Sequence, residues 1–370
     1  RSTHRMDFDD QMVMARQILA KDEQILREYS ERYPYILVDE AQDTSKIQHV
    51  IIAMLAKANE NLFMVGDEDQ SIYGFRAAYP KALLSFEKVH ENAKVLYMEQ
   101  NFRSDGHIVE ASDRFIQKNV FRHPKKMEAT HEKKRPVKEI RVRTREEQYG
   151  KLVEAAKEAD RQTAVLYRDN ESAIPLIDRL DRSGVSYSVR ARDAAFFTNR
   201  TVTDIRNIIL FSENTADAEL FLKVKAKIGI KVKTSKISWE LKKKRPDEDV
   251  FEFLKKEDVA KKLGMYGNDT AFIRMVSKTQ AQVGKLKSDS AKAALSRICD
   301  SLGYLKYLEF TKLSDRSVGT LKLVAGDIES AKGLLVRLDE LRCLMENGPD
   351  ANGHVILSTI HSSKGLEYDR

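Results

Sequence analysis

The chain has 370 residues, with 64 Lys and Arg against 57 Asp and Glu, and a formal net charge of +7 at pH 7. This length predicts two or three domains at roughly 150 residues each. The basic balance favours a polyanionic partner such as nucleic acid, although a merely basic soluble surface explains it equally well. Two cysteines, Cys299 and Cys343, argue against a disulfide framework or a cysteine metal cluster and favour a reducing, cytoplasmic compartment. Short apolar runs and the lack of a secretory start argue against a membrane protein.

The first elements that the sequence predicts are helical. Residues 7–33 have apolar side chains at helical spacing, and Asp7 can cap the start of this pattern, so we expect one or two helices there. Residues 45–58 carry a second helical pattern.

Continuous apolar runs that end in polar or acidic residues flank that second helix. Residues 35–38 and 61–65 are two such runs, and residues 94–98 repeat the pattern. Continuous apolar runs are typical of parallel sheets that are buried on both faces. We therefore expect three strands whose carboxyl ends meet at one crevice.

After a predicted helix at 106–120, the sequence changes character. Residues 121–138 are basic and contain proline, and they indicate a solvated loop or linker. A second α/β alternation follows, which predicts another sheet. Its expected strands lie at 139–144, 163–168 and 185–190.

Strand signals nearly vanish between about residue 204 and residue 346, where lysine-rich helical patterns replace them. One more strand pattern occurs at 354–360. We therefore expect a helical insertion that interrupts the second sheet, and a return of the chain to that sheet.

The acidic end of the first strand is the first candidate site. Asp39 and Glu40 directly follow the apolar run "YILV", and ligands of open α/β sheets bind at the carboxyl ends of strands. An ordinary acidic strand end is the alternative for two such residues alone. The phosphate-loop pattern G-x-x-x-x-G-K-[ST] does not occur in this sequence.

Four ordered blocks add context to that site. They are "YILVDEAQD", "VGDEDQSIYGFRAA", "YMEQNFRS" and "ILSTIHSSKGLEYD". The second supplies Gln70, which can reach a phosphate or its attacking water. The third supplies Arg103, a fixed cation that can neutralise a transferred phosphoryl group. With these blocks the chain resembles the superfamily 1A DNA helicases of the UvrD/Rep/PcrA type along nearly its whole length.

This resemblance implies roles in ATP hydrolysis for the carboxylates and their neighbours. Asp39 would hold Mg²⁺, Glu40 would polarise the attacking water, Gln70 would sense the γ-phosphate and Arg103 would act as the arginine finger. These side chains are of the types that phosphoryl transfer requires.

Three further positions would bind the nucleotide by the same resemblance. Phe102 would stack on the adenine, at a position where the family more often has tyrosine. Gln100 would contact the nucleotide, and Glu367 would lie near its ribose or the metal.

The resemblance also implies contacts with single-stranded DNA at Tyr73, Phe75 and Arg76. Thr359 and His361 belong to the segment that would couple DNA to nucleotide. Phe75 replaces the family's usual tryptophan, which affects how strongly a base stacks there. A core phenylalanine is the alternative, but Phe75 lies between Gly74 and Arg76 after a turn, and we expect it to be exposed.

The basic run from Lys223 to Arg245 has two interpretations. It is either a solvated helix face or a surface that contacts duplex phosphates, as the family's second accessory domain does. We expect Trp239, the sole tryptophan, to anchor the core of that domain.

The resemblance predicts an α/β fold with two incomplete RecA-like parallel-sheet motor domains and a helical domain inserted in the second. The predicted parts are 1–104 in the first motor, 105–204 and 348–370 in the second, and 205–347 in the insertion. The family's phosphate loop and its last arginine-bearing block are missing, and we expect a piece of a longer protein that is inactive alone.

The intact protein would couple Mg-ATP hydrolysis to 3′-to-5′ movement on single-stranded DNA and to unwinding at duplex junctions, in DNA repair or replication, without a membrane. The alternative is a degenerate, non-catalytic scaffold or DNA-binding subunit of a repair complex. Such a subunit has no physical need of a water activator and an arginine finger.

Overall fold

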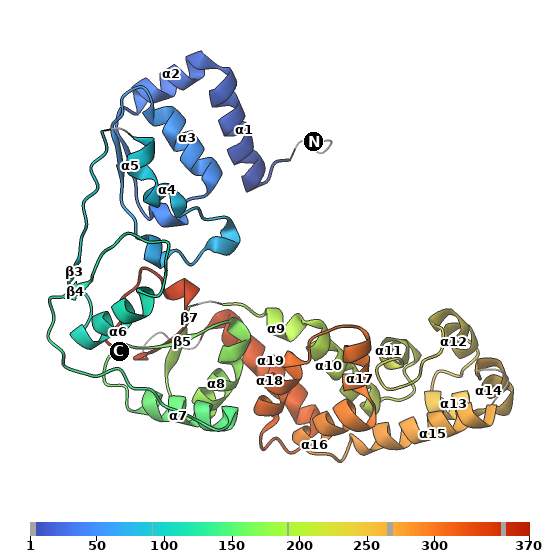
Figure 1. Ribbon diagram of the computed structural model, residues 1–370. Coiled ribbons are helices and arrows are strands. Elements are labelled where there is room, and N and C mark those ends of the chain that lie inside the picture. The colour runs from blue at the N-terminus through green and yellow to red at the C-terminus, as the bar shows by residue number, and fades with distance from the viewer. Residues whose placement is uncertain (1–4, 91, 191, 265–268, 349–352) are drawn as a thin grey trace. The chain divides into compact units, whose positions relative to one another are not determined.

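A computed structural model of the chain describes residues 5–90, 92–190, 192–264, 269–348 and 353–370. It divides into two compact units at residue 140, and Figure 1 shows the order of their elements. The two units are built around separate parallel sheets.

Two capped helices open the first unit. Asp7 and Asp10 each accept the backbone N–H of the other, which forms a capping box at the start of α1 (Phe8–Lys21). Asp22 caps α2 (Glu23–Arg32). These are the helices that the apolar spacing predicts.

The sheet of the first unit has one exposed face. β1 (Ile36–Val38) pairs in parallel with β2 (Leu62–Met64), and α3 (Lys46–Ala56) connects them. Leu37 is 74% exposed and Phe63 is 59% exposed. The expectation of a sheet buried on both faces is therefore wrong for the residues described, because alternate strand side chains point to opposite faces and only one face is covered.

The third expected strand does not join this sheet. Residues 94–99 are not in a strand, and β3 is only Gln100–Asn101, which pairs in parallel with β4 (Glu128–Ala129). β3 therefore belongs to a separate two-stranded ladder. The other elements of this unit are η1 (Ala41–Asp43), η2 (Glu68–Gln70), η3 (Gly74–Arg76), α4 (Lys81–Leu84), α5 (Phe86–Val89) and α6 (Gly106–Ile116).

The division between the two compact units lies after Ile140, and the motor-domain boundary after Ser104 stays a prediction. Residues 105–140 stay with the first unit because Arg122 pairs with Asp69 and because β4 pairs with β3.

The second unit contains a three-stranded parallel sheet. β5 (Thr163–Tyr167) and β6 (Tyr187–Val189) both pair with β7 (Val355–Thr359), which lies between them. All of β7 is buried. In Figure 1, α7 (Arg145–Lys157) and α8 (Asn170–Arg182) lie beside these strands.

Between β6 and β7, every regular element in the described part of the chain is helical. One buried cluster runs from Tyr149 on α7 through these helices to Leu357 on β7. The elements are α9 (Ala195–Thr198), α10 (Arg200–Glu213), α11 (Ala218–Val224), α12 (Thr234–Leu241), α13 (Val250–Lys255), α14 (Glu257–Leu263), α15 (Asp269–Lys285), α16 (Ala291–Ser296), the π-helical η5 (Arg297–Ser301), α17 (Tyr304–Phe310), α18 (Arg316–Ala325) and α19 (Ala331–Asn347).

Two expectations about this half of the chain are wrong. Trp239 is 65% exposed on α12 and does not anchor the core, which Ile237 and Leu241 of the same helix enter instead. Residues 139–144 form no strand, because they are largely exposed and have no ladder in the structure described.

Gly353 lies just before β7 and packs closely against the backbone of β6. A Cβ at this position would lie 2.4 Å from the carbonyl oxygen of Ser186 and 2.8 Å from Tyr187 N. We expect Gly353→Ala to lower the free energy of unfolding by about 1–3 kcal/mol, measured by urea denaturation followed by circular dichroism.

Gly150→Ala is the matched control for this prediction. Gly150 lies within α7, and nothing is within 4 Å of a Cβ added there. Alanine favours helices over glycine by about 1 kcal/mol, so this variant should be as stable as the unaltered chain or more stable. A Gly353→Ala chain as stable as Gly150→Ala would contradict the predicted overlap.

Candidate functional site

Asp39 and Glu40 lie at the carboxyl end of β1 and are both exposed. The Oδ1 atom of Asp39 accepts the backbone N–H of Glu40 at 2.9 Å. Glu40 has φ of 48°, a left-handed conformation that non-glycine residues rarely adopt. Such strain persists where the surrounding structure holds it, and it is frequent at functional sites.

A buried glutamine connects this strand end to the next one. Gln42 is 1% exposed, its Nε2 donates to the carboxylate of Glu40, and its Oε1 accepts the backbone N–H of Asp67 at 3.0 Å. Gly66 permits this approach, since a Cβ there would lie 2.7 Å from Oε1 of Gln42. Gln42 is not among the site residues expected from the sequence, although a glutamine two residues after the strand-end Asp39-Glu40 pair was a signal that could have found it.

Gln70 lies on the turn that follows β2. Its Nε2 donates to Oδ2 of Asp67 at 2.8 Å, and the Oδ1 atom of Asp67 accepts the backbone N–H of Asp69 at 3.1 Å. Because β1 and β2 are parallel neighbours, the structure brings Asp39, Glu40 and Gln70 to one edge of their sheet.

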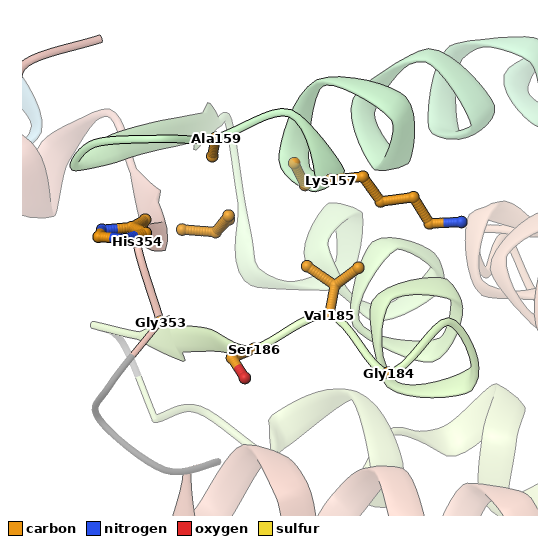
Figure 2. Close-up of a pocket in the computed structure, with 9 residues that line it drawn as sticks. Lys157, Ala159, Gly184, Val185, Ser186, Gly353 and His354 are labelled. Carbon is orange, nitrogen blue, oxygen red and sulfur yellow. The ribbon is translucent and has the colours of Figure 1, made fainter.

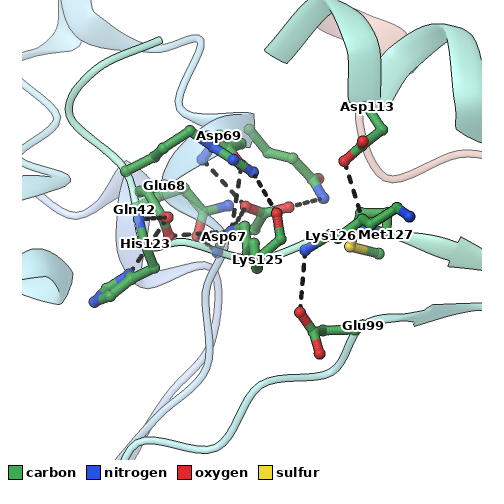
Figure 3. A network of polar contacts seen from close by, with 12 residues as sticks. Gln42, Asp67, Glu68, Asp69, Glu99, Asp113, His123, Lys125, Lys126 and Met127 are labelled. Atoms are coloured by element: carbon green, nitrogen blue, oxygen red, sulfur yellow. Dashed lines mark hydrogen bonds and ion pairs between the residues drawn. The ribbon is translucent and has the colours of Figure 1, made fainter. Parts of the chain in front are cut away.

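A basic segment packs against this turn, as Figure 3 shows. We call residues 122–131 the basic strap. Arg122 forms a bidentate ion pair with Asp69 (Nη2 to Oδ2, 2.7 Å), and Lys125 Nζ lies 2.5 Å from Oδ1 of Asp67 and 3.2 Å from Oε2 of Glu68. The expectation that 121–138 is only a solvated loop is wrong for the strap, because its cations neutralise carboxylates that follow β2.

These contacts shift the pKa values of the groups in the cluster. Burial opposes the charge on Glu68, but the backbone N–H of His123 and the ammonium of Lys125 outweigh it and lower the pKa of the carboxyl. Burial also opposes the charge on Lys125, and the carboxylates around it together raise its pKa. The hydrogen bond to Asp69 raises the pKa of Arg122.

Phe102 and Arg103 project from a loop that Asn101 holds. Oδ1 of Asn101 accepts the backbone N–H groups of Arg103 at 3.0 Å and of Ser104 at 2.9 Å. Phe102 is 65% exposed, and Arg103 and Gln100 are also exposed. The loop therefore presents a ring and a cation on a fixed backbone.

An aromatic pair lies at the turn η3, where Tyr73 is half-buried directly before the turn and Phe75 lies on it. The ring centroids of Tyr73 and Phe75 are 6.0 Å apart, and the guanidinium carbon of Arg76 lies 5.1 Å from the Tyr73 centroid and 5.6 Å from the Phe75 centroid. Phe75 is 70% exposed, so the expectation that it lies outside the core is confirmed. The arrangement offers π-faces and a positive charge together.

Three candidate residues of the second unit lie at the end of β7 or after it. Thr359 is 9% exposed, and its Oγ1 accepts the backbone N–H of Ser362 at 3.1 Å, which begins the turn η6 (His361–Ser363). His361 is half-buried and Glu367 is exposed. Thr359 thus shapes the turn that carries His361.

The pocket in Figure 2 lies at the other end of the second sheet. Its volume is about 400 Å³, and it is lined by Val185, Ser186, Gly353 and His354 among others. These residues precede or begin β6 and β7. Ligands of parallel sheets bind at the carboxyl ends of strands, so this pocket is not our candidate site.

Neither a multi-carboxylate metal centre nor a membrane-crossing helix occurs in the part of the chain that the structure describes. No group of three or more His, Cys, Asp or Glu could hold a metal ion there. No helix there has the length and apolar character that crossing a membrane requires.

The lowered pKa of Glu68 generates a test of the cluster. Because the pKa of Glu68 is lower in the folded state, the folded chain binds fewer protons than the unfolded chain. The Glu68 carboxylate therefore stabilises the fold fully above its ordinary pKa of 4.5, and this stabilisation is lost as the pH falls through the lower folded pKa. We expect hydrogen-exchange protection of residues 62–76 to fall as pH drops below about 4.5.

Glu68→Gln should flatten this pH dependence, because glutamine does not titrate. Glu87→Gln is the control, since Glu87 is an exposed glutamate of the same unit on α5. If Glu68→Gln keeps the full pH dependence of the unaltered chain, another group is responsible for it.

Family models match the chain almost from end to end. The UvrD/REP helicase N-terminal domain matches residues 1–91, and the UvrD-like helicase C-terminal domain matches residues 96–370.

Individual relatives agree with these models. A putative ATP-dependent DNA helicase YjcD of Bacillus subtilis is 30% identical over 98% of this chain and 48% of its own length. ATP-dependent DNA helicase Rep of Buchnera aphidicola is 27% identical over 100% of this chain and 60% of its own. ATP-dependent DNA helicase PcrA of Leuconostoc citreum is 31% identical over 59% of this chain and 30% of its own. The chain thus spans less than two thirds of the length of each of these relatives.

Proposed function

The chain belongs to the UvrD/Rep helicase family, and on this premise we propose that it forms part of an ATP-dependent DNA helicase. The full-length protein would couple Mg-ATP hydrolysis to 3′-to-5′ movement on single-stranded DNA and to unwinding of duplex, in repair or replication. The observation that carries this proposal is the position of Asp39, Glu40 and Gln70 at one edge of the β1–β2 sheet. The two units would be parts of its two RecA-like motor domains.

The residues present fit a metal that arrives with its nucleotide. Asp39 is one exposed carboxylate at a strand end, and Mg²⁺ is usually held by one or two carboxylates together with phosphates and water. Asp39 would hold this Mg²⁺. When bound, the ion would neutralise charge on the phosphates.

Glu40 would orient the attacking water and accept its proton. The amide of Gln42 fixes one side of the Glu40 carboxylate, and the strained backbone sets its direction. A general base must lie within reach of its proton, so such fixation serves this role. Gln70 would then sense the terminal phosphate from the neighbouring strand end.

Arg103, Phe102 and Gln100 would contact the nucleotide from the Asn101 loop. A fixed guanidinium can stabilise charge that develops on a transferred phosphoryl group. Phe102 would stack on the base with its exposed ring, and Gln100 would contact the same nucleotide. By the family resemblance, Glu367 would lie near the ribose or the metal.

Single-stranded DNA would bind on the Tyr73–Phe75 pair. An exposed ring accepts any base on its π-face, so it holds a strand without reading its sequence. Arg76 lies over both rings and adds a positive charge for the backbone. His361 and Thr359 would couple this strand to the nucleotide through the η6 turn.

Only some lysines of the basic run from Lys223 to Arg245 would contact duplex phosphates. Lys225 is 4% exposed and donates to the carbonyl of Val232, and Lys227 forms an ion pair with Asp204. These two lysines stabilise the helical region. Other lysines of the run are exposed and would meet the phosphates. They include Lys223, Lys231, Lys233, Lys236 and Lys242, whereas exposed Lys243 pairs with Glu240.

Two substitutions in the full-length protein separate hydrolysis from DNA binding. Phe75→Ala should weaken single-strand binding by roughly 1–3 kcal/mol through loss of stacking, while hydrolysis at saturating DNA survives. Arg103→Ala should leave DNA affinity nearly intact and lower kcat by about 10³ to 10⁵, because it removes charge stabilisation in the transition state. ATPase assays and fluorescence anisotropy measure the two effects.

Phe115→Ala and Arg114→Ala are matched controls, since both residues are exposed on α6 of the same unit. Neither should change strand affinity or kcat. If Phe75→Ala lowers stability but not strand affinity, its ring is a folding element. If Arg103→Ala hydrolyses ATP at the normal rate, Arg103 is not the arginine finger. If the unaltered full-length protein hydrolyses no ATP at saturating DNA, the non-catalytic scaffold becomes the better description.

The exposed lysines predict a change in salt dependence. Replacing Lys231, Lys233 and Lys236 with glutamine should flatten the plot of log duplex affinity against log salt by about one unit for each phosphate that is no longer neutralised. Replacing Lys285, Lys287 and Lys292, which are equally exposed elsewhere in the unit, should not. Equal slopes for the two triple variants would show that the stretch is a solvated face.

A further inference from the structure

The basic strap contacts two loops that carry candidate catalytic residues. On one side it contacts the turn Asp67–Gln70, and on the other it contacts the loop that carries Phe102 and Arg103. Both loops and the strap belong to the first unit. One short segment therefore contacts the supports of Gln70 and of Arg103.

Ion pairs hold the strap to the Gln70 turn. The Arg122 and Asp69 side chains are 6% and 9% exposed, and those of Lys125 and Glu68 are 12% and 5% exposed. His123 adds a backbone N–H that donates to Oε1 of Glu68 at 2.8 Å. Charge pairs with so little solvent are weakly screened and geometrically fixed.

Hydrogen bonds from backbone N–H groups of the strap and from the His131 ring hold it to the Arg103 loop. Thr130 N donates to the carbonyl of Asn101 at 3.0 Å, and Lys126 N donates to Oε1 of Glu99 at 3.0 Å. His131 Nε2 donates to the carbonyl of Phe102 at 2.7 Å. This side of the strap does not depend on the side chains of its lysines.

A short chain of contacts leads from Lys125 to Gln70. Lys125 Nζ binds Oδ1 of Asp67 at 2.5 Å, and Oδ2 of the same carboxylate accepts Nε2 of Gln70 at 2.8 Å. The carboxylate is thus held from one side and orients the amide on the other. Removing the ammonium would leave Asp67 beside two nearly buried carboxylates, Glu68 and Asp69, which repel it.

We propose that the basic strap positions the phosphate-sensing machinery, with Lys125 as a positioning residue that acts on Gln70 through Asp67. The strap holds the Gln70 turn and the Arg103 loop in a common frame. This inference rests on the proposed function, because it assigns a task to a side chain of the hydrolytic site.

The test uses the full-length protein with saturating single-stranded DNA. Lys125→Met should lower kcat for ATP by roughly 10- to 100-fold, as misplacement of a catalytic group does, and change KM for ATP less than threefold. Lys125→Arg should restore most of kcat, because arginine keeps the charge and can bond Asp67. Lys126→Met is the control, since its side chain is exposed next to Lys125 and only its backbone contacts Glu99.

A double-mutant cycle separates positioning from general damage. In a Gln70→Ala background, Lys125→Met should cause less than a twofold further loss of kcat, because the side chain that it positions is already absent. Asp67→Asn keeps the shape of the carboxylate and removes its charge. Like Lys125→Met, it should lower kcat in the unaltered protein and cause less than a twofold further loss in the Gln70→Ala background. This second variant serves if Lys125→Met does not fold.

The outcomes distinguish this inference from the function on which it rests. If Gln70→Ala lowers kcat but Lys125→Met lowers it equally in both backgrounds, Lys125 does not act through Gln70 and the inference is wrong. An unchanged kcat in Lys125→Met has the same meaning. If Gln70→Ala hydrolyses ATP normally, Gln70 is not the phosphate sensor and the inference is wrong while the proposed function stands. If the unaltered protein lacks DNA-stimulated hydrolysis, the proposed function fails and the inference fails with it.

Discussion

Neutralisation of three consecutive carboxylates determines how the first unit is built. Asp67, Glu68 and Asp69 directly follow β2, and the latter two side chains are almost excluded from water. Carboxylates this close repel one another, and burial strengthens the repulsion. Arg122 and Lys125 supply the opposite charge from a segment more than 50 residues later. Gln70 therefore lies where it does because charge from a distant part of the chain stabilises its turn.

Parallel pairing explains why the candidate residues gather at strand ends. Asp39 and Glu40 follow β1 and the Gln70 turn follows β2 in the sheet of the first unit, and Thr359 ends β7 in the separate sheet of the second unit. All carboxyl ends of a parallel sheet share one edge, and helices leave that edge open to ligands. Buried Gln42 joins the first two of these ends through side-chain hydrogen bonds. The candidate site of the first unit thus needs few residues, because the parallel pairing of β1 and β2 already brings their strand ends together.

Local sequence patterns correctly predicted the structural features that depend only on residues close together in the chain. The cap at Asp7, the strands β5, β6 and β7, and the exposed turn at Phe75 all follow from residues within a few positions. The role of Lys125 and the separate ladder of β3 depend on partners far away in sequence, which no local pattern encodes. Trp239 illustrates the same limit, since its neighbours Ile237 and Leu241 fill the core that its size suggested for it. Composition could indicate a basic surface, but it could not indicate which lysines form hydrogen bonds or ion pairs within the fold, as Lys225 and Lys227 do.

The central position of β7 has a consequence for synthesis on the ribosome. β5 and β6 are not paired with each other, and both depend on a strand that emerges only after residue 354. Until then, two apolar strands of the second unit have unsatisfied edges while the whole helical stretch is being made. Unpaired edges of this kind recruit other chains. The nascent protein therefore has a window of aggregation risk that narrows when β7 enters the sheet, and during this window the cell's chaperones have an opportunity to bind it.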